Sequence, residues 1–136
     1  MIRFHTIDDF EIAHNSKLKT WIKSVIRKER STLDELNFIF CDDKYLLEKN
    51  KTFLNHDTLT DIITFDYSEK NTVKGDVFIS IERVKENAIV YKVSFENELQ
   101  RVIIHGVLHL LGYKDNNEKQ KREMRKKEDF YLSLKT

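Results

Sequence analysis

Two patterns of apolar and polar residues alternate along the chain, and they predict strands and helices. Short apolar runs rich in aromatic and β-branched residues predict four strands, over residues 1–7, 36–41, 61–67 and 76–81. Apolar residues three and four positions apart predict helices over residues 17–29, 82–91, 95–112 and 117–134, with a further helix starting at residue 42. We therefore expect one α+β domain over residues 1–136, with a small mixed sheet and several helices.

The ends of two predicted helices carry residues that favour helix termini. Ser16 precedes the helix over 17–29 and Ser94 precedes the helix over 95–112, so each serine is a predicted N-cap. Gly112 stands at the end of the second helix, where a glycine can adopt the positive φ that reverses the chain. We therefore expect the chain to turn at Gly112.

The predicted helix over 95–112 is apolar around nearly its whole circumference, as a central buried helix would be. At about 100° per residue, one polar stripe interrupts the apolar surface. The stripe consists of Ser94, Glu98, Arg101, His105, His109 and Gly112. Burying polar groups is costly unless they are paired or ligated, so we expect the stripe to line a cleft.

His105 and His109 lie one helical turn apart in this stripe. Two imidazoles at this spacing can bind one metal ion, although hydrogen-bonded or surface histidines are the alternative. Gly112 follows His109 by three positions, and Asp115 follows Gly112 by three, so the turn can bring a carboxylate back to the metal. Two imidazoles, one carboxylate and one open position are typical of a catalytic zinc site, here with one ion per chain.

The same histidine spacing occurs in zinc peptidases, which place a glutamate general base directly after the first histidine. Gly106 occupies that position here. The sequence therefore argues against a peptidase of that type, and a zincin-like metallopeptidase is kept as an alternative.

The composition excludes several classes of metal site and of cellular location. The single cysteine, Cys41, excludes an internal disulfide and zinc sites built from several thiolates, and we expect it to be buried in a strand. The longest apolar stretch, over 102–113, is too short for a membrane span, and the amino terminus lacks a signal-peptide core. We therefore expect a cytoplasmic protein without a membrane partner, with His5, His14 and His56 at the surface.

Charge is unevenly spread, although the formal net charge is only +1. Residues 1–30 carry seven Lys and Arg against four acids, and residues 117–136 also carry seven against four. This excess at both ends is compatible with a polyanionic partner, but solvated helix faces have the same composition.

Several segments resemble the YbeY-type rRNA maturation endoribonucleases, a bacterial family of metal-dependent RNases. HGVLHLLGYKD at 105–115 is similar to the family's metal signature, and TDIITFDY at 60–67 and GDVFIS at 75–80 are similar to two of its strands. The resemblance covers almost the whole chain. Further matching positions are Glu98, Met124 and Glu128.

The resemblance implies a zinc-dependent endoribonuclease that acts on single-stranded RNA, in 16S rRNA 3′-end maturation and ribosome quality control. Its partners would be rRNA and ribosomal particles, with no DNA expected. The metal would polarise the scissile phosphate, activate water, or do both, and the basic segment 119–127 could contact the RNA backbone. The alternative from another class is a non-catalytic RNA- or ribosome-binding module with a structural zinc.

Two positions depart from the family's pattern. The family's third metal ligand is a histidine, and Asp115 stands there in this chain; zinc accepts carboxylate oxygen, so we expect the site to remain. The arginine that the family carries upstream of the strand at 60–67 aligns with Leu54. Arg101 could replace that cation, or it could form a salt bridge to Glu98. Glu98 and Arg101 are therefore the candidate catalytic residues. They would orient the metal ligands or stabilise charge that develops during the reaction.

Overall fold

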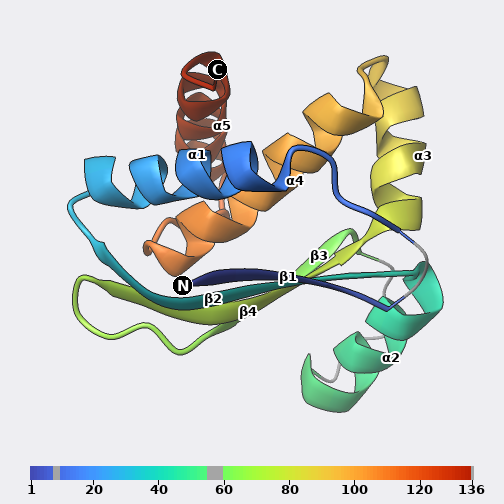
Figure 1. Cartoon of the computed structure of the whole chain (residues 1–136). Coiled ribbons are helices and arrows are strands. Elements are labelled where there is room, and N and C mark those ends of the chain that lie inside the picture. Colours follow the sequence, from blue (N-terminus) through green and yellow to red (C-terminus); the bar gives the residue numbers. More distant parts are fainter. Residues whose placement is uncertain (8–9, 55–59, 136) are drawn as a thin grey trace.

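The computed structural model describes residues 1–7, 10–54 and 60–135, except for the side chains of residues 53 and 54. None of the described helices is both long and apolar enough to cross a membrane. The elements follow one another as β1 (Ile2–Thr6), α1 (Asn15–Lys28), β2 (Thr32–Cys41), α2 (Asp43–Leu54), β3 (Ile62–Asp66), β4 (Thr72–Ser80), α3 (Ile81–Tyr91), α4 (Phe95–Leu110) and α5 (Glu118–Ser133) (Figure 1).

The four strands form one mixed sheet in the order β1-β2-β4-β3, which confirms the predicted α+β fold. β1, β2 and β4 run parallel, and β3 pairs antiparallel with β4 at an edge. β2 and β4 begin four residues earlier than the apolar runs predict. Their first residues, over 32–35 and 72–74, pair with each other through the backbone. Leu33 and Val73 are apolar, but polar residues stand on both sides of each, so no continuous apolar run marks these positions.

The two faces of the sheet carry different helices. Figure 1 shows α1 and α4 over one face and α2 on the other. Alternation along β4 explains the division, because Val77 and Ile79 belong to the main core whereas Phe78 belongs to a smaller cluster with Leu46 of α2. Cys41 is buried in that smaller cluster, as predicted.

Helix α4 packs closely against the sheet because Gly106 has no side chain. A Cβ atom at Gly106 would lie 2.9 Å from Cδ1 of Ile62 and 3.0 Å from Cγ1 of Val77. The position that carries the general base in a zinc peptidase therefore faces β3 and β4 in this fold. This packing agrees with the sequence argument against a peptidase of that type.

The predicted N-cap is confirmed for α4 and wrong for α1. The Ser94 hydroxyl accepts a hydrogen bond from the Asn97 amide at 3.0 Å. Ser16, in contrast, already lies inside α1, because His14 adopts a left-handed conformation with φ 57° and occupies the cap position. The His14 carbonyl accepts from the Leu18 amide at 3.0 Å, so the helix starts without a side-chain cap.

Candidate metal centre and cleft

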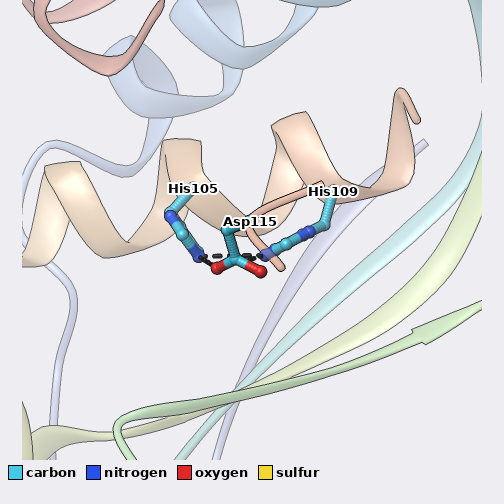
Figure 2. A group of neighbouring side chains, drawn as sticks. All are labelled: His105, His109 and Asp115. Carbon is cyan, nitrogen blue, oxygen red and sulfur yellow. Dashed lines mark hydrogen bonds and ion pairs between the residues drawn. The ribbon is translucent and has the colours of Figure 1, made fainter. Parts of the chain in front are cut away.

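Three potential ligand atoms face one another beside the C-terminal half of α4 (Figure 2). His105 and His109 occupy successive turns of the helix, and their Nε2 atoms lie 3.0 Å apart. Oδ2 of Asp115 lies 3.4 Å from each of these Nε2 atoms. The structure therefore brings together the three side chains that the sequence singles out as metal ligands.

The turn after α4 returns Asp115 to the helix. Gly112 has a φ of 103°, a conformation that residues with a Cβ rarely adopt. Its amide donates to the His109 carbonyl, and the Tyr113 amide donates to the Leu108 carbonyl, both at 3.0 Å. This pair of hydrogen bonds is the Schellman motif, which ends a helix and reverses the chain.

Each imidazole is oriented through its Nδ1 atom. The Nδ1–H group of His105 donates to Oε2 of Glu128 at 2.6 Å, and that of His109 donates to the Tyr113 carbonyl at 3.0 Å. A carboxylate and a carbonyl can only accept, so this pattern assigns the proton to Nδ1 in both rings. In the neutral form of each ring, Nε2 therefore presents a lone pair toward Asp115, as in metal-ligating histidines.

The geometry of the three atoms fits a zinc ion. With both rings neutral, two lone pairs and a carboxylate oxygen at 3.0–3.4 Å repel one another unless a cation lies between them. Ligands about 2.0–2.1 Å from a tetrahedral zinc lie about 3.3 Å from one another, which is close to the observed separations. The three side chains remain partly exposed, at 24%, 25% and 37%, which leaves an approach for a further ligand.

The surroundings of His105 favour positive charge. Burial by itself would lower the pKa of His105, because it disfavours the imidazolium. The hydrogen bond and charge of Glu128, together with the charges of Asp115 and Asp61, outweigh burial and raise the pKa above its ordinary value. The same negative field would stabilise a bound cation.

A cleft of about 650 Å³ opens beside the polar stripe of α4. Glu98, Arg101 and His105 line it from α4, and Asp115 lines it from the following turn. Asp61, directly before β3, lines the same cleft, and its pKa is raised chiefly by burial. The structure therefore places both candidate catalytic residues beside the candidate ligands.

Glu98 is a nearly buried carboxyl group, with only 5% of its surface exposed. Within the described part of the chain, its side chain forms no hydrogen bond. Burial, and then the negative charge of Asp61, raise the pKa of Glu98. Such a carboxyl group accepts a proton more readily than an exposed one does.

Arg101 does not form the predicted alternative salt bridge to Glu98. Its guanidinium donates to Oε1 of Glu128 at 2.9 Å and to Oδ1 of Asp129 at 2.7 Å. Because Glu128 also accepts from His105, the three residues form a chain of charge-assisted hydrogen bonds that ends at a candidate ligand. The prediction of an Arg101–Glu98 pair was wrong because α5 supplies two other carboxylates.

The remaining predicted positions lie away from this centre or outside the described residues. His5 is exposed and lies 3.2 Å from the Asn37 side-chain oxygen, and the His14 side chain is 61% exposed, so both are surface residues. His56 lies outside the described residues. The backbone of Leu54 ends α2, but its side chain is not described, so the predicted loss of a cation there stays a prediction.

The sequence identifies Glu128 only as a position that matches the family and does not predict a role for it in the site. The described buried residues of α5 are Met124, Glu128 and Tyr131, so this glutamate occupies the apolar face of an amphipathic helix. An acid at such a position needs a buried partner. The spacing of Glu128 from Met124 and Tyr131 could therefore have indicated a buried acid. The identity of its partner, His105, depends on how α5 packs against α4.

Comparisons with known proteins show the family to which this chain belongs. The family model described as Endoribonuclease YbeY matches residues 4–135. An endoribonuclease YbeY of Flavobacterium psychrophilum is 54% identical over 98% of this chain and 96% of its own length, and that of Cytophaga hutchinsonii is 50% identical over 92% and 88%. The solution structure of a Thermotoga maritima protein superposes with a TM-score of 0.70, at 31% identity, over 98% of this chain and 87% of that one. The chain therefore belongs to the endoribonuclease YbeY family.

Proposed function

We propose that this protein is an endoribonuclease that cleaves single-stranded RNA and holds one zinc ion on His105, His109 and Asp115. The observation that carries the proposal is the approach of three potential ligand atoms to within 3.0–3.4 Å of one another. Membership of an endoribonuclease family supports RNA as the substrate. We extend the proposal to 16S rRNA 3′-end maturation and ribosome quality control in the cytoplasm.

The chain's own residues would prepare the reaction by orienting ligands and accepting protons. A zinc ion in this centre would supply a Lewis acid for the phosphate and lower the pKa of water. Glu128 and the Tyr113 carbonyl hold the rings of His105 and His109 through Nδ1. The Glu98 carboxyl group, with a raised pKa and no hydrogen bond among the described residues, is the group we assign to take a proton at Oε.

Arg101 would supply positive charge in the cleft. A guanidinium has five N–H groups, and the contacts with Glu128 and Asp129 use only part of this capacity. Donors aimed at a developing phosphoryl charge stabilise the transition state. Arg101 would therefore act in two ways, by contacting the phosphate and by positioning Glu128.

Helix α5 would bind the RNA backbone. Four cations of this helix line the cleft, within the basic segment that the sequence assigns to RNA contact: Lys121, Arg122, Arg125 and Lys126. Cations placed along a cleft bind phosphates and release counterions, so affinity should fall as salt rises.

The proposal is tested by cleavage assays on matched substrates with the zinc-loaded protein. We expect cleavage of single-stranded RNA, slower cleavage of duplex RNA, and no cleavage of DNA or of an unstructured peptide. Loss of RNA cleavage in His105→Ala, with retained far-ultraviolet circular dichroism, would support the proposal. Peptide cleavage would instead favour a metallopeptidase, and zinc-dependent RNA binding without cleavage would favour a binding module.

The two roles of Arg101 can be separated by comparing cleavage with zinc affinity. Loss of one positioned donor typically costs about 10²–10³ in rate. If Arg101 contacts the phosphate, Arg101→Ala should lose cleavage while zinc content stays intact. A parallel loss of zinc affinity would show that it also acts through Glu128, and full recovery of cleavage at saturating zinc would show that it acts through Glu128 alone. Leu54→Arg should change cleavage without changing zinc binding, if Leu54 stands where the family has its cation.

The ribosomal role needs a cellular readout. Depletion of the protein should lead to accumulation of 16S rRNA precursors extended at the 3′ end, and the parent gene should reverse this effect. His109→Ala should fail to reverse it. Normal 16S rRNA ends after depletion would overturn this part of the proposal and leave the nuclease activity as a separate question.

A further inference from the structure

Tyr91 is an exposed aromatic residue at the edge of the candidate active-site cleft. It is the last residue of α3, its surface is 60% exposed, and it lines the same cleft as His105. The helix end that carries it is well defined, because Lys92 adopts a left-handed conformation with φ 58° and the Val93 amide donates to the Ala88 carbonyl at 3.0 Å. Tyr91 therefore lies on a fixed element rather than in a long loop.

The Tyr91 side chain has no partner among the described residues. The tyrosines of the core are different, since Tyr113 and Tyr131 both donate their hydroxyl groups to Glu29. The Tyr91 ring contacts no other ring, and its hydroxyl forms no hydrogen bond within the described part of the chain. A solitary exposed aromatic residue is common on protein surfaces, so its position in the cleft is what carries the argument.

Two arginines of α5, Arg122 and Arg125, line the same cleft and can bind phosphate. Both α3 and α5 pack against α4, and residues of all three helices line the cleft. Arg122 and Arg125, three positions apart on α5, form no ion pair with any described carboxylate. The cleft thus offers an exposed aromatic ring and two guanidinium groups in the same cavity that His105 and Asp115 line.

These features match the two halves of a nucleotide in a single strand. Phosphates bind cations without regard to sequence, whereas an unstacked base can lie against an aromatic ring. A base paired in a duplex has both faces covered, so it cannot use such a ring. A cleft of about 650 Å³ is within the range of pockets that bind small organic ligands, which suffices for a nucleotide.

We propose that Tyr91 is a base-stacking subsite for a nucleotide next to the scissile phosphate, with Arg122 and Arg125 binding the adjoining backbone. This inference rests on the proposed endoribonuclease function and adds a source of selectivity for single strands. The tyrosine ring, rather than its hydroxyl, provides the contact.

The test compares Tyr91→Ala and Tyr91→Phe with the parent, all zinc-loaded, on a fluorescein-labelled single-stranded RNA and its duplex. Stacking on one aromatic ring is worth about a tenfold change in affinity or more. We expect Tyr91→Ala to raise KM for the single strand by about that factor, with the duplex unaffected, and Tyr91→Phe to behave like the parent. Tyr67→Ala is the matched control, because Tyr67 is 55% exposed and does not line the cleft.

A second arm tests the phosphate contacts and the position of the base. Arg122→Ala should weaken binding and reduce the salt dependence of affinity by about one charge, whereas Lys23→Ala, on α1, should not. RNAs that lack one base at successive positions should identify the base that stacks on Tyr91. When that base is missing, the parent and Tyr91→Ala should have the same KM. Equal KM for the parent and Tyr91→Ala would overturn the subsite and leave the nuclease intact, whereas failure of the parent to cleave any RNA would overturn the proposed function itself.

Discussion

Lys127 and Glu128, consecutive residues of α5, belong to two polar clusters with opposite electrostatics. Lys127 donates to Glu29 at 3.1 Å, and the hydroxyl groups of Tyr113 and Tyr131 donate to the same carboxylate. Burial alone would raise the pKa of Glu29, but these three donors outweigh burial and lower it. In this Glu29 cluster, the negative charge is fully compensated by donors.

Glu128 belongs to the candidate metal centre, where acceptors outnumber donors. His105, His109 and Asp115 point three acceptor atoms at one another, and the nearby Glu98 carboxyl group has a raised pKa. The comparison shows how two clusters of similar composition can be told apart. Donors that satisfy every acceptor indicate a stabilising role, whereas facing acceptors without a donor indicate a site for a cation.

Tyr113 connects the two clusters. Its hydroxyl donates to Glu29 at 2.5 Å, and its carbonyl accepts from His109 at 3.0 Å. The Glu29 cluster therefore holds the turn from which Asp115 reaches the histidines. Changes in the candidate metal centre should affect mainly metal binding, and changes in the Glu29 cluster should affect mainly the free energy of unfolding.

The largest effect is expected from removing a ligand. His109→Ala should lower zinc affinity by more than the 10–100-fold that loss of an outer partner typically costs, because it removes a donor atom. The metal-free protein should stay folded, since the variant also relieves repulsion between facing acceptors. Zinc titration by isothermal calorimetry measures the change, and His14→Ala, at an exposed histidine, is the matched control. Unchanged affinity in His109→Ala would contradict the assignment.

A smaller effect on the same centre is expected from Glu128→Gln. The variant removes the charge that orients and polarises His105, so zinc affinity should fall about 10–100-fold. Asp129→Asn is the control, because Asp129 binds the same arginine but has a side chain that is 57% exposed. Equal zinc affinities for the two variants would show that the Glu128–His105 contact does not tune the metal.

In the Glu29 cluster, Glu29→Gln should reduce stability rather than metal content. Loss of charge-assisted hydrogen bonds should lower the free energy of unfolding by about 2 kcal/mol at neutral pH. The folded-state pKa of Glu29 is lowered, so this contribution is present above the ordinary value of 4.5 and is lost as pH falls through the folded-state pKa. Urea unfolding of the parent and the variant between pH 3 and pH 7, a range on both sides of the ordinary pKa of 4.5, measures the difference in their free energies of unfolding. A constant difference over this range would contradict the role of ionised Glu29.

The smallest effect is expected from Tyr131→Phe, which removes one of the three donors to Glu29. The free energy of unfolding should fall by about 1 kcal/mol. Burial, and then the bond to Glu29, raise the pKa of Tyr131 above its ordinary value of 10. The contribution is therefore present below pH 10 and lost as pH rises through the folded-state pKa. If the difference between parent and variant grows at alkaline pH instead, this account of the cluster is wrong.

Local patterns in the sequence predict much of the fold and the ligand set. The spacing of His105 and His109 and the turn at Gly112 depend only on helix geometry and on the conformational freedom of glycine. The prediction fails where the conformation of the backbone or the packing of a distant element determines the contact. Ser16 is inside α1 because His14 adopts a left-handed conformation, which its sequence neighbours do not reveal.

The partners of the ligands illustrate the same limit. Glu128 lies 23 positions from His105, so their contact depends on the crossing of α4 and α5. The salt bridge predicted between Arg101 and Glu98 considered one helix alone, and the carboxylates of α5 replace it. Residue types and spacing thus identify the ligands, whereas tertiary packing identifies the residues that orient them.

The function proposed for this protein depends on a zinc centre formed by the facing side chains at the end of α4. The most direct measurement is anomalous X-ray diffraction at the zinc edge from crystals of the zinc-loaded protein. We expect one anomalous peak per chain, within bonding distance of Nε2 of His105, Nε2 of His109 and a carboxylate oxygen of Asp115. A peak elsewhere, or an Asp115 side chain that points away from both imidazoles, would contradict it.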